Sequence, residues 1–255
     1  MNKDGIVRCH EVYLFGMVVL STIHRLVGNF PVTDTYGEID QTHSLPGGEA
    51  GNSATVLNAF GYGVKLDGPF LGRRTRGPVR AFYEGIGVDC SGMECDDGCD
   101  GVEDLVIVAG NSRTVFGRFA AFFSGGRRWS VPDEAAIASA SIVGLDPFFY
   151  RESELTAEFC VKHGVPYVTL DCAPDSFMCK NAAAVVISGE YIRDKYPEAN
   201  IDGLFELYAS RASGLVIFTF GSNDIMYGRK GSAPARMKPL RVDAKSTLGA
   251  GDTFR

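Results

Sequence analysis

The pattern of hydrophobic and polar positions alternates between short continuous apolar runs and stretches with apolar residues three and four apart. The short runs predict buried strands, and the periodic stretches predict helices with one apolar face. The expected strands cover residues 12–20, 64–71, 142–145, 165–171, 184–188 and 215–220. The expected helices cover residues 52–60, 78–85, 132–140, 152–163 and 201–212. Strands alternating with helices predict an α/β domain with a largely parallel sheet covered on both faces.

Two segments depart from this alternation, at residues 34–45 and 103–123. Both are rich in β-branched and aromatic residues at nearly alternating positions, without a helical apolar stripe. They predict either a small antiparallel sheet that projects from the main layer or edge strands of the main sheet. A projecting sheet could close over a substrate and exclude water. No long linker interrupts the chain, so the pattern predicts a single domain over residues 1–255.

The composition, 45% hydrophobic and 22% charged over 255 residues, is typical of a globular protein with a sizeable core. The net charge is −6 and most Lys and Arg residues are scattered, which argues against a nucleic-acid partner. The apolar run at residues 13–20 is too short to span a bilayer, and no cleavage site follows a basic start. We therefore expect a cytoplasmic protein with no membrane partner.

The seven cysteines and four histidines do not have the spacing of a metal site. Cys90, Cys95 and Cys99 cluster in an acidic segment, but no paired CxxC and no nearby histidine completes four ligands. The odd number of cysteines and their distribution over separate predicted elements favour reduced thiols over disulfides.

The first glycine-rich turn, PGGEAGN at residues 46–52, precedes an expected helix. Gly47 and Gly48 permit backbone close to a ligand, and Asn52 can both donate and accept hydrogen bonds, as binding of a polyol requires. The turn is neither a P-loop nor a GxGxxG motif, because the required spacing and lysine are missing. By itself it is more typical of a flexible turn before a helix.

The second glycine-rich turn is TLGAGD at residues 247–252. Gly249, Ala250 and Gly251 allow backbone N–H groups to converge at a helix start, which is the physical basis of an anion hole. Asp252 could accept a proton from a hydroxyl that attacks a phosphorus held by those amides. Without further residues, an ordinary glycine loop with a helix-starting Asp explains this turn as well.

Together the two turns resemble those of the PfkB, or ribokinase-like, sugar kinase family. Weaker points of resemblance are Gly16, the GVD at residues 87–89 and the TFGS at residues 219–222. The resemblance implies a three-layer α/β/α domain with a mostly parallel sheet and a small β-lid, with lid strands within residues 34–45 and 103–123. It also implies ATP- and Mg²⁺-dependent phosphorylation of a sugar-like hydroxyl, and it leaves dependence on a monovalent cation open.

The resemblance assigns roles to residues at the matching positions. Asp252 corresponds to the catalytic base, and the anion-hole amides correspond to Gly249, Ala250 and Gly251. The substrate turn corresponds to Gly47, Gly48 and Asn52, with the glycines as a hinge for lid closure. The segments that border the nucleotide contain Thr219, Gly221 and Thr247.

This chain also departs from the family pattern. Ser21 stands where the family commonly has an Asp that binds sugar hydroxyls; a substrate contact and a plain loop serine are both open. Arg74 replaces a common Asp, so Arg73, Arg74 and Arg76 predict either a site for an acidic substrate or a solvated basic loop. Glu190 retains only the Glu of an N-x-x-E element linked with magnesium, and could organise metal-bound water or begin a helix.

Three functions remain open from the sequence. The leading one is a kinase for a sugar or sugar-like alcohol. A nucleoside kinase of the same fold could use stacking aromatics, and the candidates are Phe116, Phe119, Phe122 and Phe123. A non-catalytic sugar-binding relative is the third.

Two expectations concern the whole protein. Family members continue with further helices after GAGD, whereas here Thr253, Phe254 and Arg255 follow it. We expect either a truncated form of a longer protein or weak ATP binding, because three residues cannot form a stable helix. An exposed edge of the lid could pair two subunits into a homodimer.

Overall fold

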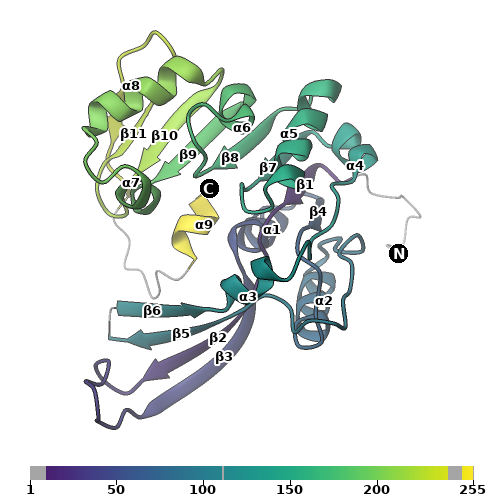
Figure 1. The fold of residues 1–255 in the computed structure, drawn as a ribbon, viewed down its shortest axis with the longest axis vertical. Helices are drawn as coiled ribbons and strands as arrows, with labels where there is room; N and C mark the ends of the chain where they lie inside the picture. Colours follow the sequence, from purple (N-terminus) through teal and green to yellow (C-terminus); the bar gives the residue numbers. More distant parts are fainter. Residues whose placement is uncertain (1–9, 111, 241–248, 255) are drawn as a thin grey trace.

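The computed structural model describes residues 10–110, 112–240 and 249–254, and contains a main sheet with a smaller sheet beside it (Figure 1). The main sheet has eight strands in the order β12-β11-β10-β9-β8-β7-β1-β4. Their bounds are β1 Val12–Phe15, β4 Val64–Asp67, β7 Ile142–Leu145, β8 Tyr167–Leu170, β9 Ala184–Ser188, β10 Leu215–Thr219, β11 Ile225–Gly228 and β12 Ala235–Met237. Strands β4, β1, β7, β8, β9 and β10 are parallel, and β11 and β12 are antiparallel additions at one edge.

Helices cover both faces of the main sheet, and the side-chain alternation of β1 separates the two faces. Tyr13 and Phe15 belong to one buried cluster, and Val12 and Leu14 belong to another. The first cluster packs under α4 Glu134–Ser139, α5 Arg151–His163, α6 Phe177–Asn181, α7 Gly189–Lys195 and α8 Ile201–Arg211. The second packs under α1 Glu49–Ala59 and α2 Arg76–Ile86. This architecture confirms the predicted α/β fold class, and β7 and β9 occupy the predicted residues.

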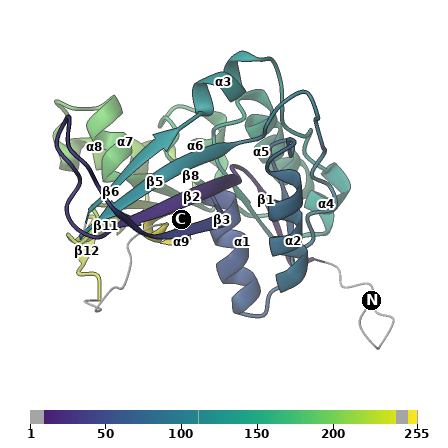
Figure 2. The ribbon, with the colours of Figure 1, turned by 90° about the horizontal axis from the view of Figure 1, so that it is seen from below.

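The smaller sheet, which we call the small sheet, has four strands in the order β3-β2-β5-β6. They are β2 Val19–Leu26, β3 Ile39–Gly47, β5 Glu103–Ala109 and β6 Ser112–Gly117. Figure 2 shows the four strands β6, β5, β2 and β3 side by side. The expected antiparallel arrangement is wrong for the central pair, because β2 and β5 run parallel while the two outer pairs are antiparallel.

The apolar run at residues 12–20 is not the single strand that the sequence predicts. It divides at Gly16 into β1 of the main sheet and β2 of the small sheet. The residues between the strands, Met17 and Val18, are buried as well, so the hydrophobic pattern continues across the connection. Periodicity cannot detect a turn whose residues are all buried.

The segment at residues 103–123 is only partly β-structure, because its end forms the helix α3, Phe119–Ser124. Phe122 and Phe123 pack against Trp129, with ring centroids 6.1 and 5.8 Å from the indole. Burial of these aromatic rings against the main body therefore overrides their strand propensity. The sequence also missed the short elements α6, β11 and β12, whereas α7 is the helix that was one of the two alternatives for Glu190. Within the described ranges, no helix combines the length and the apolar character needed to cross a membrane.

We predict that Gly16→Ala destabilises the protein by about 1–3 kcal/mol, because overpacking at a buried turn forces neighbouring atoms apart. An added Cβ would lie 2.3 Å from Oδ2 of Asp146 and 3.1 Å from Cβ of Ala50. Urea denaturation measures the change in the free energy of unfolding. Gly28→Ala is the control, since its added Cβ has no atom within 4 Å. Equal unfolding free energies for the two variants would contradict the prediction.

Candidate active site

The start of α1 is held by the turn between β1 and β2. The carbonyl of Met17 accepts hydrogen bonds from the N–H groups of Ala50 and Gly51, at 3.2 and 3.3 Å. Gly48 precedes the helix with φ of +88°, and an added Cβ there would lie 2.5 Å from the Met17 oxygen. Only glycine fits this close approach at that backbone conformation. The backbone packing at Met17 therefore requires a glycine at position 48, independently of any contact with a ligand.

Asp146 holds the other side of the same peptide segment. Its carboxylate follows β7 and accepts hydrogen bonds from the N–H groups of Met17 and Phe148. Burial raises the pKa of Asp146 well above its ordinary value, and the negative charge of Glu49 raises it further. Asp146 therefore positions the turn between β1 and β2.

The two glycine turns meet through α1 and α9, Ala250–Phe254, as Figure 1 shows near the centre of the molecule. The Nδ2 of Asn52 donates to Oδ2 of Asp252 at 2.9 Å, although the residues are 200 positions apart. The Ser53 hydroxyl donates to the Asp252 carbonyl at 3.3 Å. Gly249 has φ of +71°, and an added Cβ would lie 2.9 Å from Nδ2 of Asn52. The structure thus brings together the residues predicted for substrate binding and for catalysis.

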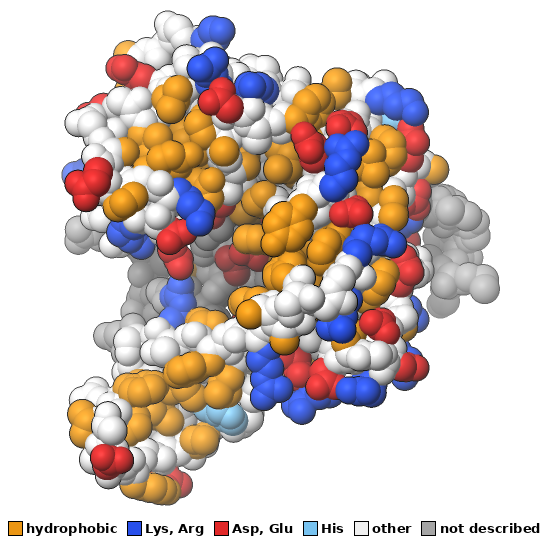
Figure 3. All heavy atoms as spheres, viewed as in Figure 1, with side chains coloured by type: hydrophobic (Ala, Val, Ile, Leu, Met, Phe, Trp, Pro, Cys, Tyr) orange, Lys and Arg blue, Asp and Glu red, His pale blue; other side chains and the backbone are white. Residues whose placement is uncertain are grey.

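Ser21 and Gly47 of the first glycine turn lie close to Asn52. A Cβ built on Gly47 would lie 3.6 Å from Oδ1 of Asn52 and 3.9 Å from the Ser21 hydroxyl. Ser21 belongs to β2, so one wall of the site comes from the small sheet. Figure 3 shows a hollow between the small sheet and the main body.

Sequence reasoning missed Asp104 of β5, which pairs in register with Ser21. Burial raises the pKa of Asp104, the charge of Asp252 raises it further, and an interaction with the Ser21 hydroxyl opposes both effects. Asp104 therefore lies near the Asn52–Asp252 contact. Its sequence signal is only an acidic residue at one position of a predicted strand, which is also typical of a solvent-facing side chain.

The residues predicted for the nucleotide and the metal lie at another part of the sheet edge. Thr219 ends β10 and pairs with Ser188, which ends β9. Gly221 lies two residues after Thr219 and has φ of +64°. Glu190 lies two residues after Ser188, in the first turn of α7, and its side chain is exposed. Thr247, predicted beside the nucleotide, lies outside the described residues.

The basic loop forms ion pairs with its own neighbours. Arg73 pairs with Asp100 at 2.8 Å, Arg74 with Glu103 at 3.0 Å and Arg76 with Asp97 at 3.2 Å. All three guanidinium groups are largely exposed. Of the two readings left open by the sequence, these contacts favour the solvated basic loop.

The aromatic residues considered for stacking on a nucleoside are used elsewhere. Phe122 is buried in the main core, and Phe119 and Phe123 pack against that core. Phe116 of β6 is exposed and pairs with Leu105, whose side chain lies on the opposite face of β5 from Asp104. Phe116, Phe122 and Phe123 therefore do not supply a stacking surface beside Asp252. The Phe119 ring also reaches the small sheet, where it lies 2.5 Å from the position of a Cβ added to Gly117, the Cα partner of Asp104.

The described residues contain no group of three His, Cys, Asp or Glu side chains that could hold a metal ion. Mg²⁺ in ATP-dependent enzymes usually keeps several waters and binds one or two carboxylates together with phosphate oxygens. A single carboxylate such as Glu190 is compatible with that mode of binding. The six cysteines in the described ranges, which include Cys90, Cys95 and Cys99, are free.

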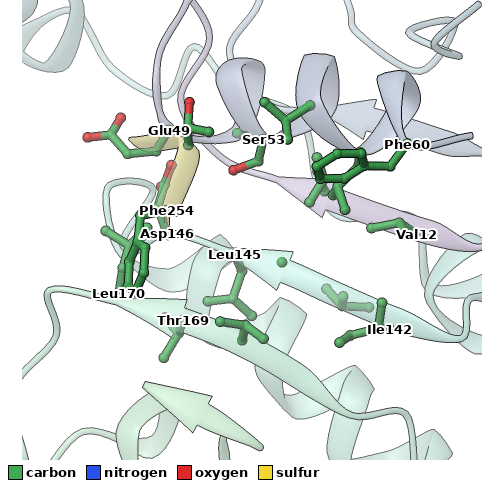
Figure 4. A pocket seen from close by; sticks show the side chains of 18 residues that line it. Val12, Glu49, Ser53, Phe60, Ile142, Leu145, Asp146, Thr169, Leu170 and Phe254 are labelled. Carbon is green, nitrogen blue, oxygen red and sulfur yellow. The ribbon is translucent and has the colours of Figure 1, made fainter. Parts of the chain in front are cut away.

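A cavity of about 300 Å³ is lined by α1, α9 and the strands β1, β7 and β8 (Figure 4). Its lining is mostly apolar and includes Leu14 and Leu145. Glu49, Asp146 and Phe254 lie together at one end. A polyhydroxylated ligand needs several polar partners, so this lining does not suit it. The Asn52–Asp252 contact, with Ser21 on the neighbouring strand β2, offers the better set of polar groups.

Comparison with known proteins gives structural neighbours only. The sequence matches no protein-family model and no curated protein. A protein of Agrobacterium tumefaciens, provisionally described as a ribokinase, superposes with a TM-score of 0.80 at 17% identity, covering 96% of this chain and 81% of the other. The Arabidopsis thaliana ribokinase, solved with ribose and ATP, has a TM-score of 0.72 at 16% identity, with coverages of 96% and 83%.

The chain has the ribokinase-like fold. Nucleoside kinases with this fold are also similar to it. The Burkholderia thailandensis nucleoside kinase, solved with inosine, has a TM-score of 0.68 at 14% identity, covering 95% of this chain and 81% of the other. Identities this low establish the ribokinase-like fold, and the function must be argued from the residues of this chain.

We predict that Asn52→Asp destabilises the protein at pH 7 and that the deficit shrinks as the pH falls toward 5. The new carboxylate would face Asp252 at the present 2.9 Å hydrogen-bond distance, which raises the folded-state pKa of the pair. Protonation then stabilises the folded state, so stability rises as the pH falls through that pKa. Urea denaturation at several pH values measures the effect.

Asn200→Asp is the matched control for this prediction. Asn200 caps α8 by accepting a hydrogen bond from the N–H of Gly203 through its side-chain oxygen. Asp caps helices about as well as Asn, so this variant should change stability little at pH 7. An Asn52→Asp deficit that is absent, or that grows toward low pH, would contradict the prediction.

Proposed function

We propose that the chain is an ATP-dependent kinase that transfers a phosphoryl group to a hydroxyl of a sugar or sugar-like substrate. The observation that supports this most strongly is the hydrogen bond between Asn52 and Asp252. It joins a turn suited to binding hydroxyl groups with a turn suited to activating one of them. The ribokinase-like fold makes the same assignment reasonable, because its solved members include sugar kinases and nucleoside kinases.

In this proposal Asp252 takes the proton from the acceptor hydroxyl. Asn52 donates to Oδ2 of Asp252 and thereby orients the carboxylate. The backbone N–H groups of Gly249, Ala250 and Gly251 stabilise the negative charge that develops on the transferred group. Most of the rate enhancement then comes from positioning and electrostatics, as is usual in phosphoryl transfer.

ATP would supply the phosphoryl group and Mg²⁺ would neutralise charge on its phosphate oxygens. We propose Thr219, Gly221 and Thr247 as residues that border the nucleotide, and Glu190 as a residue that holds water bound to the metal. Thr219 and Glu190 belong to the neighbouring carboxyl ends of β10 and β9, where open α/β sheets commonly bind ligands. The dependence on a monovalent cation stays open.

We propose that the protein is one domain and that its small sheet acts as a lid over the substrate. Ser21 extends from this sheet, and Gly47 and Gly48 connect it to α1, so they can act as its hinge. Closure would exclude water, which competes with the acceptor hydroxyl. The outer strands β3 and β6 could pair two lids into a homodimer. We also propose that the protein is cytoplasmic and that its substrate is a small molecule.

A sugar kinase fits this site better than a nucleoside kinase, because Phe122 and Phe123 pack in or against the main core and Phe116 lies on the opposite face of the small sheet from Asp104. A sugar-binding protein without catalysis would not need a carboxylate at the helix start beside the substrate turn. Direct assay of ADP release with sugars and nucleosides distinguishes these functions. Binding of a sugar without ATP-dependent turnover would favour the non-catalytic relative.

We predict that Asp252→Asn lowers kcat by about a hundredfold to ten-thousandfold, because loss of a positioned base has effects of this size. The amide cannot accept the proton, although its oxygen can still accept the hydrogen bond from Asn52. ADP release coupled to a second enzyme measures turnover. Circular dichroism and urea denaturation should show a retained fold.

Asp194→Asn is the control with the same chemical change. Asp194 is exposed on α7 and pairs with the adjacent Lys195 at 2.9 Å. This variant should keep wild-type kcat. Wild-type turnover in Asp252→Asn would exclude Asp252 as the base.

A further inference from the structure

Asp104 lies on the face of the small sheet that carries Ser21. The two residues are Cα partners in the parallel β2–β5 pairing, so their side chains leave the sheet on the same side. On the next strand the partner of Asp104 is Gly117, and the Phe119 ring lies on the same face there, 2.5 Å from the position of an added Gly117 Cβ. The preceding residue, Glu103, lies on the opposite face and pairs with Arg74 at 3.0 Å.

One oxygen of Asp104 lacks a hydrogen-bond donor within the described structure. Oδ1 is buried and has no partner there. A buried carboxylate oxygen without a donor is unfavourable, and most such atoms in folded proteins are satisfied by the protein, water or a ligand. A group that brings an O–H or N–H donor to this position would therefore gain a charge-assisted hydrogen bond.

Polar groups connect the surroundings of Asp104 with the Asn52–Asp252 contact. The Ser21 hydroxyl lies beside it, and the Cβ position of Gly47 lies 3.9 Å from that hydroxyl and 3.6 Å from Oδ1 of Asn52. Asn52 in turn contacts Asp252. A ligand in contact with Asp252 and Asn52 can therefore extend toward Ser21 and Asp104 on the small sheet.

The charge of this surface favours an uncharged ligand. Asp104 and Asp252 are both acidic, and the charge of Asp252 raises the pKa of Asp104, so the two groups interact. The three arginines of the neighbouring loop pair with acidic residues elsewhere, at Asp100, Glu103 and Asp97. A phosphate or carboxylate placed between Asp104 and Asp252 would meet like charge without a compensating cation from that loop.

We propose that Asp104 binds the substrate by accepting a hydrogen bond from a second hydroxyl of an uncharged polyol, and that it disfavours anionic sugars. The acceptor hydroxyl lies at Asp252, Asn52 contacts the substrate between the two carboxylates, and Ser21 assists Asp104. This inference rests on the proposed kinase function and gives its substrate class. It makes the small sheet a determinant of specificity besides a cover.

The test compares wild type with Asp104→Asn in the full chain. Initial rates of ADP release are measured with D-ribose, D-fructose, D-glucose and inosine, and with the anions ribose 5-phosphate and D-gluconate. For the neutral substrate that wild type uses, Asp104→Asn should raise KM by about tenfold to a hundredfold, as expected for a hydrogen bond to a charged group. kcat should change less than threefold. The ratio of kcat/KM for the neutral substrate to kcat/KM for an anionic substrate should fall by a similar factor in Asp104→Asn.

Glu103→Gln is the matched control, because it removes a carboxylate from the adjacent residue on the opposite face of β5. It should leave KM and kcat within twofold of wild type. A deoxy analogue of the neutral substrate gives a second readout. Removing the hydroxyl that Asp104 binds should raise KM in wild type and have little further effect in Asp104→Asn, which a merely structural role would not produce.

The outcomes separate this inference from the proposed function. If wild type turns over a neutral substrate and Asp104→Asn has the same KM, the proposed role of Asp104 is wrong. It is also wrong if wild type prefers ribose 5-phosphate. Neither result contradicts the proposed kinase function. If wild type shows no ATP-dependent turnover, the kinase proposal fails, and calorimetric titration with the same neutral sugars then tests Asp104. Tenfold weaker binding by Asp104→Asn supports its role; equal binding, or no binding by wild type, overturns it.

Discussion

The structure depends on one buried peptide segment at Met17. Its N–H donates to the carboxylate of Asp146 in the main sheet, and its carbonyl accepts the first N–H groups of α1. The same short connection joins β1 of the main sheet to β2 of the small sheet. These contacts fix the main sheet, the first helix and the small sheet relative to one another, because buried backbone groups must keep their partners. Gly16 and Gly48 allow the close approach on either side.

The candidate site is assembled on this frame from segments that are distant in the sequence. α1 presents Asn52, α9 presents Asp252, and the small sheet presents Ser21 and Asp104. Thr219 and Glu190, proposed for the nucleotide and the metal, lie at the neighbouring ends of β10 and β9. This separation suits a reaction in which one substrate meets another between a covering sheet and the edge of a parallel sheet. The acidic groups Asp104 and Asp252 interact with each other, whereas the arginines of the adjacent loop are paired at the surface.

Several residues in and around this site have conformations or environments that are unfavourable elsewhere in proteins. Gly48 and Gly249 have positive φ, Asp146 is a fully buried carboxyl with a raised pKa, and Asp104 has a buried oxygen without a donor. The glycines and Asp146 are explained by close packing and by the Met17 turn. Asp104 has no such structural explanation, which is why a ligand is the natural partner for it.

The sequence by itself determined the α/β class, most helices and buried strands, and the two glycine turns, because these depend on local periodicity and on residues with special backbone freedom. It did not reveal the division of residues 12–20, since a buried turn preserves the apolar pattern. Nor did it show that Asn52 touches Asp252, that the loop arginines are paired, or that Asp104 faces the site. Only the tertiary structure decided these points, because strand register and helix packing determine which distant side chains share a surface.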